Sequence, residues 1–280
     1  MSYRISGPAI ISFSGGRTSG MMLYRILESY KGKLPDDIHV VFANTGKEMS
    51  QTLDFVRECG ERWNVPITWV EYADHDDPQQ RWKIVDYDSA SRHGEPFAAM
   101  IARKKMLPNP VMRMCTGSLK ILPKKLFAQQ FLGWNAWDVV IGFRADEQRR
   151  VARLSAPHRE PYDRVAPLAK AGITASDVSA FWQAQPFDLR LPNNNGRTMH
   201  GNCDLCFLKG ANQIMSLIRE CPTRADWWMK QETRIISKGG HGGLFRKDRP
   251  SYERMYQIVE EQAELPGIDD NAIMDCECTD

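Results

Sequence analysis

The chain has 280 residues, 42% of them hydrophobic, which suits one large α/β domain or a core domain with an appendage. Its formal net charge is +2, so no overall field favours nucleic acid or a membrane, and its short basic clusters are expected to be solvated. No apolar run could span a bilayer and no signal peptide is visible, so we expect a cytoplasmic protein with no membrane partner. Its seven cysteines then indicate metal or redox chemistry, or burial, rather than disulfides.

A loop rich in serine and glycine lies between an apolar run, Ala9–Ile11, and an apolar helical segment, Met21–Leu27. This order predicts a buried strand, a tight turn and a helix. The glycines let the backbone approach a ligand closely, and the free amides and dipole of a helix start favour an anion. We therefore expect a phosphate or pyrophosphate site, with an ordinary turn of small residues as the alternative. The candidate residues are Ser14, Gly15, Gly16, Arg17, Thr18 and Ser19.

Further buried strands are expected in three stretches, with helical patterns between the early ones: Ile38–Ala43, Pro66–Tyr72 and Trp137–Phe143. The alternation predicts a mostly parallel open sheet with helices on both faces. We expect residues 1–165 to form this α/β domain and residues 166–280 to form a helical, loop-rich segment. In that segment, Thr174 and Asp177 have the spacing of a helix capping box.

Polar residues follow two of these strands. Asn44, Thr45 and Gly46 come after the second, and Arg144 and Arg150 come after the last. Ligands gather at the carboxyl ends of strands in open α/β sheets. The two arginines are candidates for an anion clamp, because a guanidinium donates two parallel hydrogen bonds to phosphate. The alternative is an exposed helix start with ordinary ion pairs.

The cysteines fall into two kinds. Cys59 and Cys221 lie on apolar helical stripes and are expected to be small buried hydrophobes. The other five lie in loops. Of these, Cys203 and Cys206 have the spacing that lets two thiolates bind one metal ion or one cluster edge, or form a redox dithiol.

Cys115 lies between Arg113 and Lys120, an electropositive setting that should favour its thiolate. With Cys203 and Cys206 it could hold a [4Fe–4S] cluster with one iron left open. Either Cys276 or Cys278 could add a fourth ligand, and zinc is the competing metal.

Taken together, the motifs resemble the phosphoadenosine-phosphosulfate (PAPS) reductase family, within the superfamily that carries a pyrophosphate loop (PP-loop) and an adenine nucleotide α-hydrolase-like fold. The matching motifs are spread over about three quarters of the chain, so the resemblance does not depend on one short motif. Four stretches match in order: the loop with Gly15, Gly16 and Ser19; Asn44-Thr45-Gly46 with Glu48; Arg113-x-Cys115 with Leu119-Lys120 and Pro123; and Gly142-x-Arg144 with Glu147 and Arg150, which continues through Pro167-Leu168 and the pattern of Thr174, Asp177-Val178 and Trp182.

The resemblance implies an adenine nucleotide, with its adenosine near Phe13, Asn44 and Thr45 and its phosphates on the loop. It implies that Arg144 acts in catalysis and, in a reductase, that Cys278 is the nucleophile. The chain departs from the cluster-bearing reductases at Thr116, where they have a second cysteine, and after Cys278, where their Gly-x-His is missing. The three-cysteine set is similar to that of iron–sulfur tRNA thiolases.

Three functions remain open at this stage. The favoured one is sulfur transfer driven by ATP, with Mg²⁺ as a companion of the nucleotide and a sulfur donor protein as partner. The acceptor could be nucleic acid or a small molecule. The second is a PAPS or APS reductase that releases sulfite. The third is a non-catalytic nucleotide-binding accessory protein in which zinc is structural.

Overall fold

The computed structural model describes residues 3–156, 159–194, 198–237 and 243–261. A six-stranded sheet runs in the order β4-β3-β2-β1-β5-β6 and is parallel except at the β3–β4 pair. This confirms the mostly parallel open sheet, and β4 and β6 are additions that the sequence did not predict. The strands are β1 (Ala9–Phe13), β2 (Ile38–Asn44), β3 (Ile67–Glu71), β4 (Lys83–Val85), β5 (Trp137–Val140) and β6 (Tyr162–Val165).

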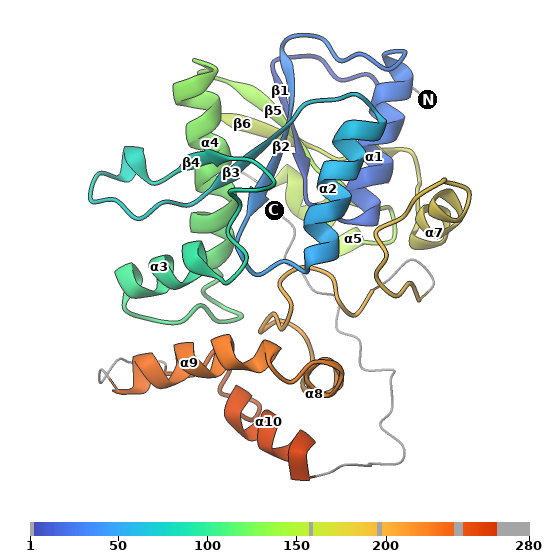
Figure 1. The fold of residues 1–280 in the computed structure, drawn as a ribbon. Helices are drawn as coiled ribbons and strands as arrows, with labels where there is room; N and C mark the ends of the chain where they lie inside the picture. Colours follow the sequence, from blue (N-terminus) through green and yellow to red (C-terminus); the bar gives the residue numbers. More distant parts are fainter. Residues whose placement is uncertain (1–2, 157–158, 195–197, 238–242, 262–280) are drawn as a thin grey trace.

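Helices cover both faces of the sheet, with α1 and α2 on one face and α4 on the other (Figure 1). The longer helices are α1 (Arg17–Ser29), α2 (Ser50–Arg62), α3 (Glu95–Lys104), α7 (Ala175–Gln183), α8 (Ala211–Glu220), α9 (Arg224–Ser237) and α10 (Tyr252–Glu261). The short turns are η1 (Pro78–Gln80), η2 (Thr116–Ile121), α4 (Leu122–Leu126), η3 (Phe127–Phe131), α5 (Gln148–Ala152), η4 (Arg153–Ser155) and α6 (Pro167–Lys170).

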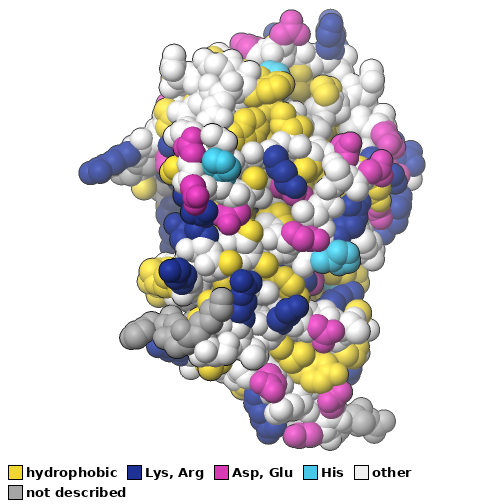
Figure 2. Space-filling model, turned by 60° about the vertical axis from the view of Figure 1, so that its left-hand side comes forward, with side chains coloured by type: hydrophobic (Ala, Val, Ile, Leu, Met, Phe, Trp, Pro, Cys, Tyr) yellow, Lys and Arg dark blue, Asp and Glu magenta, His cyan; other side chains and the backbone are white. Residues whose placement is uncertain are grey.

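The strands divide their side chains between two cores because successive residues point to opposite faces. Ile11 and Phe13 of β1 pack toward α1 and α2, whereas Ile10 packs with Phe127 and Trp137 on the α4 face. No helix of the described residues is long and apolar enough to cross a bilayer. Basic and acidic side chains are intermixed over the face in Figure 2, as the small net charge suggests.

A second core lies beneath the sheet, where α8, α9 and α10 pack together (Figure 1). Trp228 and Tyr252 are its largest buried side chains, and Phe97 of α3 joins them. By contrast, α7 packs on α1, and Trp182 of α7 belongs to the core of the sheet. The capping box predicted at Thr174 is present. The domain boundary at 165/166 stays a prediction, with residues up to Leu191 packed on the sheet side.

An ion pair between a buried arginine and a half-buried aspartate holds the segment after α7 to the start of α1. Arg17 is 5% exposed, and its guanidinium pairs with Asp188 and donates to the carbonyl of Leu191 at 2.6 Å. Burial raises the pKa of Asp188, but the hydrogen bond and charge of Arg17 outweigh it, so the pKa lies below its ordinary value. The pair therefore stabilises the fold most when the carboxylate is ionised.

We predict that Asp188→Asn lowers the free energy of unfolding by about 1–3 kcal/mol at pH 7, because a buried guanidinium loses its charged partner. A carboxylate with a lowered pKa loses its contribution as the pH falls, so the gap to the wild type should narrow below about pH 4. Urea unfolding at several pH values measures this. The matched control is Glu28→Gln at the exposed Arg25 pair, expected to cost under about 0.5 kcal/mol. A gap that stayed constant down to pH 3 would contradict the assignment.

Candidate nucleotide and thiol site

The loop between β1 and α1 is held in shape by one hydroxyl. Ser19 Oγ accepts hydrogen bonds from Ser14 N at 3.2 Å, Ser14 Oγ at 3.0 Å and Gly16 N at 3.3 Å. It donates to Gly16 O at 2.9 Å. Ser19 is buried, whereas Ser14, Gly16 and Thr18 are half-buried at the rim. The loop is thus a preformed turn whose rim, with the first amides of α1, can meet an anion.

Gly15 and Gly16 serve this loop differently. Gly15 has φ +73°, and a Cβ there would lie 2.6 Å from Thr52 Cγ2. Gly16 has φ −104°, and the atom nearest to a Cβ at that position would be Ser14 Oγ, 3.8 Å away. The fold therefore requires glycine at position 15, while the space at position 16 lies open for a ligand.

Two expected ligand contacts are occupied inside the protein. The ring of Phe13 is 1% exposed and stacks against Phe55 with centroids 6.4 Å apart, which leaves its backbone for an adenosine. The Arg17 guanidinium, expected on the phosphates, points to Asp188 instead. The sequence did not reveal this because the partner lies 171 residues away.

Arg144 lies across from the loop, as the clamp hypothesis requires. Its Nη1 donates to Thr18 Oγ1 at 3.4 Å, and its Nε donates to Asp146 at 2.9 Å. Gly142 makes this approach possible, since a Cβ there would lie 3.2 Å from Ser19 Cα. Glu147 accepts from the Arg144 amide at 2.8 Å and pairs with Arg150, so one carboxylate organises both arginines.

The loop after β2 is shaped by its own side chains. Asn44 is fully buried, and its amide nitrogen donates to Glu71 at 2.6 Å and to the Ser91 carbonyl at 2.8 Å. Its oxygen accepts from the amide of Gly46. Glu48 accepts from both the amide and the hydroxyl of Thr45. Asn44 therefore holds the loop, whose residues 44–47 are all buried.

The Cys203–Cys206 turn docks directly onto this loop. Cys203 bridges to Glu48 as an isolated antiparallel pair, and its Sγ lies 3.6 Å from Thr45 Oγ1. Asp204 donates its amide to the Lys47 carbonyl at 2.8 Å, and its carboxylate pairs with Lys47 Nζ at 2.9 Å. These contacts place the Cys203–Cys206 turn at the carboxyl end of β2. The Ser14–Ser19 loop lies at the same edge of the sheet.

Sequence reasoning missed the residues that fix this turn. The Lys209 side chain is 1% exposed, and its Nζ donates to the carbonyls of Gly201 and Cys203. Asp204 also accepts from Trp228 Nε1 at 2.8 Å. A lysine and an aspartate inside an otherwise apolar Cys-x-x-Cys segment were the available signal, since buried charges need partners.

Cys115 was expected in a loop, but it lies in the helical turn that leads into η2, whereas Cys203 and Cys206 do lie outside helices. The three thiols interact, and desolvation governs their protonation. Desolvation and then Cys206 raise the pKa of Cys115 to about 11, although Lys120 lowers it. Burial, Glu48 and Cys206 raise the pKa of Cys203 well above its ordinary value, again against Lys120. The expectation that Arg113 and Lys120 would favour a Cys115 thiolate is thus wrong for the metal-free protein. Desolvation outweighs the nearby charge.

The remaining cysteines divide as follows. Cys59 is fully buried, as predicted, and burial raises its pKa. Cys221 ends α8 half-buried rather than on its buried stripe, with its sulfur 3.4 Å from Thr223 Oγ1. Cys276 and Cys278 lie outside the described residues. Within the described ranges, no group of three or more His, Cys, Asp or Glu side chains could hold a metal ion.

The chain matches no protein-family model. It is 31% identical over 211 residues to the uncharacterized nin region protein ORF290 of Escherichia phage lambda, and the match covers 73% of this chain and 67% of that protein. Among solved structures, the U34-tRNA thiolase NcsA from Methanococcus maripaludis with its [4Fe–4S] cluster matches with a TM-score of 0.35 and 16% identity. That match covers 96% of this chain and 78% of the thiolase. A likeness this distant assigns neither fold nor function.

We predict that Gly15→Ala lowers the free energy of unfolding by about 2–4 kcal/mol, from a left-handed backbone and a clash with Thr52. Gly16→Ala is the matched control and should cost under about 1 kcal/mol, since its φ suits alanine. Denaturant unfolding measures both. Equal losses for the two variants would contradict this account of the loop.

Proposed function

The chain belongs to the same family as the nin region protein ORF290 of phage lambda, and we propose that it is a PP-loop enzyme that binds ATP and transfers sulfur. The observation that carries the proposal is the junction of Thr45 with Cys203, 3.6 Å apart. This contact places the segment that carries Cys203 at the carboxyl edge of the sheet. The Ser14–Ser19 loop, which follows β1, lies at the same edge.

The proposed roles follow from the geometry. The α1 amides and the rim hydroxyls of Ser14 and Thr18 bind the pyrophosphate of ATP, with Mg²⁺ as its companion. Glu147 holds Arg144 and Arg150, and the two arginines stabilise the negative charge that develops on the leaving pyrophosphate. An acceptor oxygen attacks the α-phosphorus and pyrophosphate leaves. Sulfide supplied by a donor protein then attacks the activated carbon and displaces AMP, which carries the acceptor oxygen away.

The cysteine set fits an iron–sulfur cluster in its donor chemistry. Cys115, Cys203 and Cys206 supply three thiols near Lys120, whose ammonium would offset the charge of thiolates. Ligands of a four-iron cluster each bind a different iron, so they need not surround one point. Among the described residues no set of three such side chains is placed around a single ion. A cluster held by three cysteines supplies an open iron where sulfide can bind.

The PAPS or APS reductase is the second candidate, and the resemblance of the motifs favours it. It needs a thiol nucleophile, for which Cys278 is the candidate, and Arg144 and Arg150 would bind the phosphosulfate instead. The accessory protein with structural zinc is the third, and Cys276 would then be the fourth ligand.

We predict that anaerobically purified protein contains about four iron and four acid-labile sulfide per chain and absorbs broadly in visible light. Cys115→Ser, Cys203→Ser and Cys206→Ser should each lose most of this iron. Cys221→Ser is the matched control and should keep it, since Cys221 lies at the end of α8 and not in the thiol set. One zinc per chain without sulfide would support the accessory protein and contradict the cluster.

We predict that ATP, with bulk tRNA or DNA as trial acceptor and sulfide as donor, yields pyrophosphate and AMP. Thr18→Val should reduce this release by about tenfold or more, since it removes a rim hydroxyl and an Arg144 contact. PAPS or APS with a dithiol should yield no sulfite. Sulfite formation that Cys278→Ser abolishes would instead establish the reductase.

A further inference from the structure

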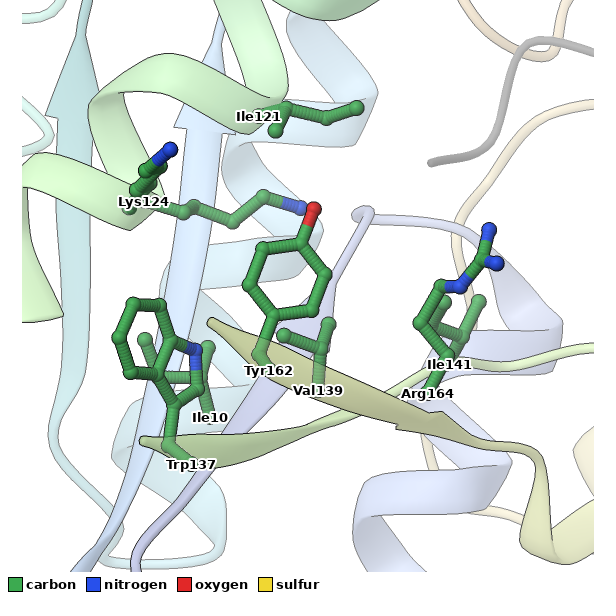
Figure 3. Close-up of a pocket in the computed structure, with 9 residues that line it drawn as sticks. Ile10, Ile121, Lys124, Trp137, Val139, Ile141, Tyr162 and Arg164 are labelled. Atoms are coloured by element: carbon green, nitrogen blue, oxygen red, sulfur yellow. The ribbon is translucent and has the colours of Figure 1, made fainter. Parts of the chain in front are cut away.

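A cavity of about 470 Å³, open to solvent, lies on the α4 face of the sheet where β1, β5 and β6 run side by side (Figure 3). Its floor is apolar: Trp137, Val139 and Ile141 alternate along and just beyond β5, and Tyr162 stands beside them on β6.

The helix α4 contacts β2 and β3 and lines one side of the cavity with Lys124 and Lys125. On the sheet side, Trp137 is buried, whereas Val139 and Tyr162 are half-buried. The rings of Trp137 and Tyr162 lie 5.6 Å apart and 36° from parallel, so the cavity has two aromatic rings that are tilted relative to each other.

The charge around the cavity is of one sign. Lys124, Lys125 and Arg164 line it, and no acidic residue is among its described lining residues. Lys124 is buried and donates to Ser12, and Lys125 pairs with Glu160 at 2.6 Å. The partners place both ammonium groups, and the Glu160 carboxylate offsets the charge of Lys125.

Arg164 adds a donor that has no acceptor. Its Nη2 donates to the carbonyls of Arg153, Leu154 and Ala156 at 3.2–3.4 Å, which fixes the guanidinium in place. Its Nε is buried and has no hydrogen-bond partner. A buried donor left without an acceptor is costly, so a small shift of the Arg164 side chain that brought Nε against an anionic oxygen in the cavity would be favourable.

We propose that this cavity binds a small flat anion, of which an aromatic carboxylate is the simplest kind. The ring would lie on Trp137, Val139 and Tyr162, and the carboxylate would accept from Arg164 Nε. The site uses residues of β5 and β6 that the nucleotide loop does not use, so the inference is independent of the proposed function.

The test is isothermal titration of the full chain with 2-naphthoate. We expect saturable binding at one site per chain, and much weaker binding of acetate, which lacks the ring, and of 2-naphthalenemethanol, which lacks the charge. Arg164→Gln should weaken 2-naphthoate binding by about tenfold or more. Arg149→Gln removes the same charge from an exposed position outside the cavity and should leave binding unchanged.

Val139→Phe, which fills the cavity without altering charge, should abolish binding. If Arg164→Gln does not fold, Lys125→Gln replaces it as the variant that removes a positive charge from the cavity. Thermal unfolding shows whether each variant is folded. Equal binding of 2-naphthalenemethanol, equal loss in the Arg149 and Arg164 variants, or no saturable binding would overturn the proposal. Displacement of 2-naphthoate by AMP would also overturn it, because the probe would then occupy the nucleotide site; iron content and pyrophosphate release are unaffected by this outcome.

Discussion

The arrangement of the site depends on one buried ion pair, Lys47 with Asp204. Lys47 comes from the loop that ends β2 and Asp204 from the turn between Cys203 and Cys206, so the pair joins the sheet to the second core. Trp228 donates to the same carboxylate, and Lys47 Nζ lies 5.1 Å from the centroid of the Trp227 ring. Removing one partner of such a pair leaves a buried charge and typically costs about 3–5 kcal/mol. The junction thus fixes where the thiols lie relative to the nucleotide loop.

The excursion between β3 and η2 reinforces this junction from the other side. Gly94 donates its amide to the Gly46 carbonyl at 2.8 Å, and a Cβ at Gly94 would lie 2.5 Å from Trp227 Nε1. Close backbone approach therefore clamps the β2 loop between α3 and α9. Both sides of the loop are packed. Glu48 therefore bonds within the loop, and Thr45 contacts the segment that carries Cys203.

The parts of the fold that local pattern determines could be predicted from the sequence. The strands at Ile38–Asn44 and Trp137–Val140, the β1 turn and the Thr174 capping box depend on residues close in the chain. What could not be predicted depends on distant partners. Arg17 has the charge of a phosphate ligand but meets Asp188, and Cys115 has basic neighbours but is buried among other thiols. Charge in a motif therefore indicates a site, and burial decides what the charge does.

Burial of the thiols also constrains what can bind them. Neutral Cys115 and Cys203 are compatible with a packed interior, whereas their thiolates are not unless a cation compensates. Metal binding must therefore release protons and supply enough affinity to offset that release. A soft metal centre that binds several thiolates at once meets this requirement, whereas weakly bound hard cations such as Mg²⁺ do not. The Ser14–Ser19 loop has the opposite character, because its hydroxyls and amides suit an anion. The thiols and this loop can thus lie at one sheet edge without competing for the same ligand.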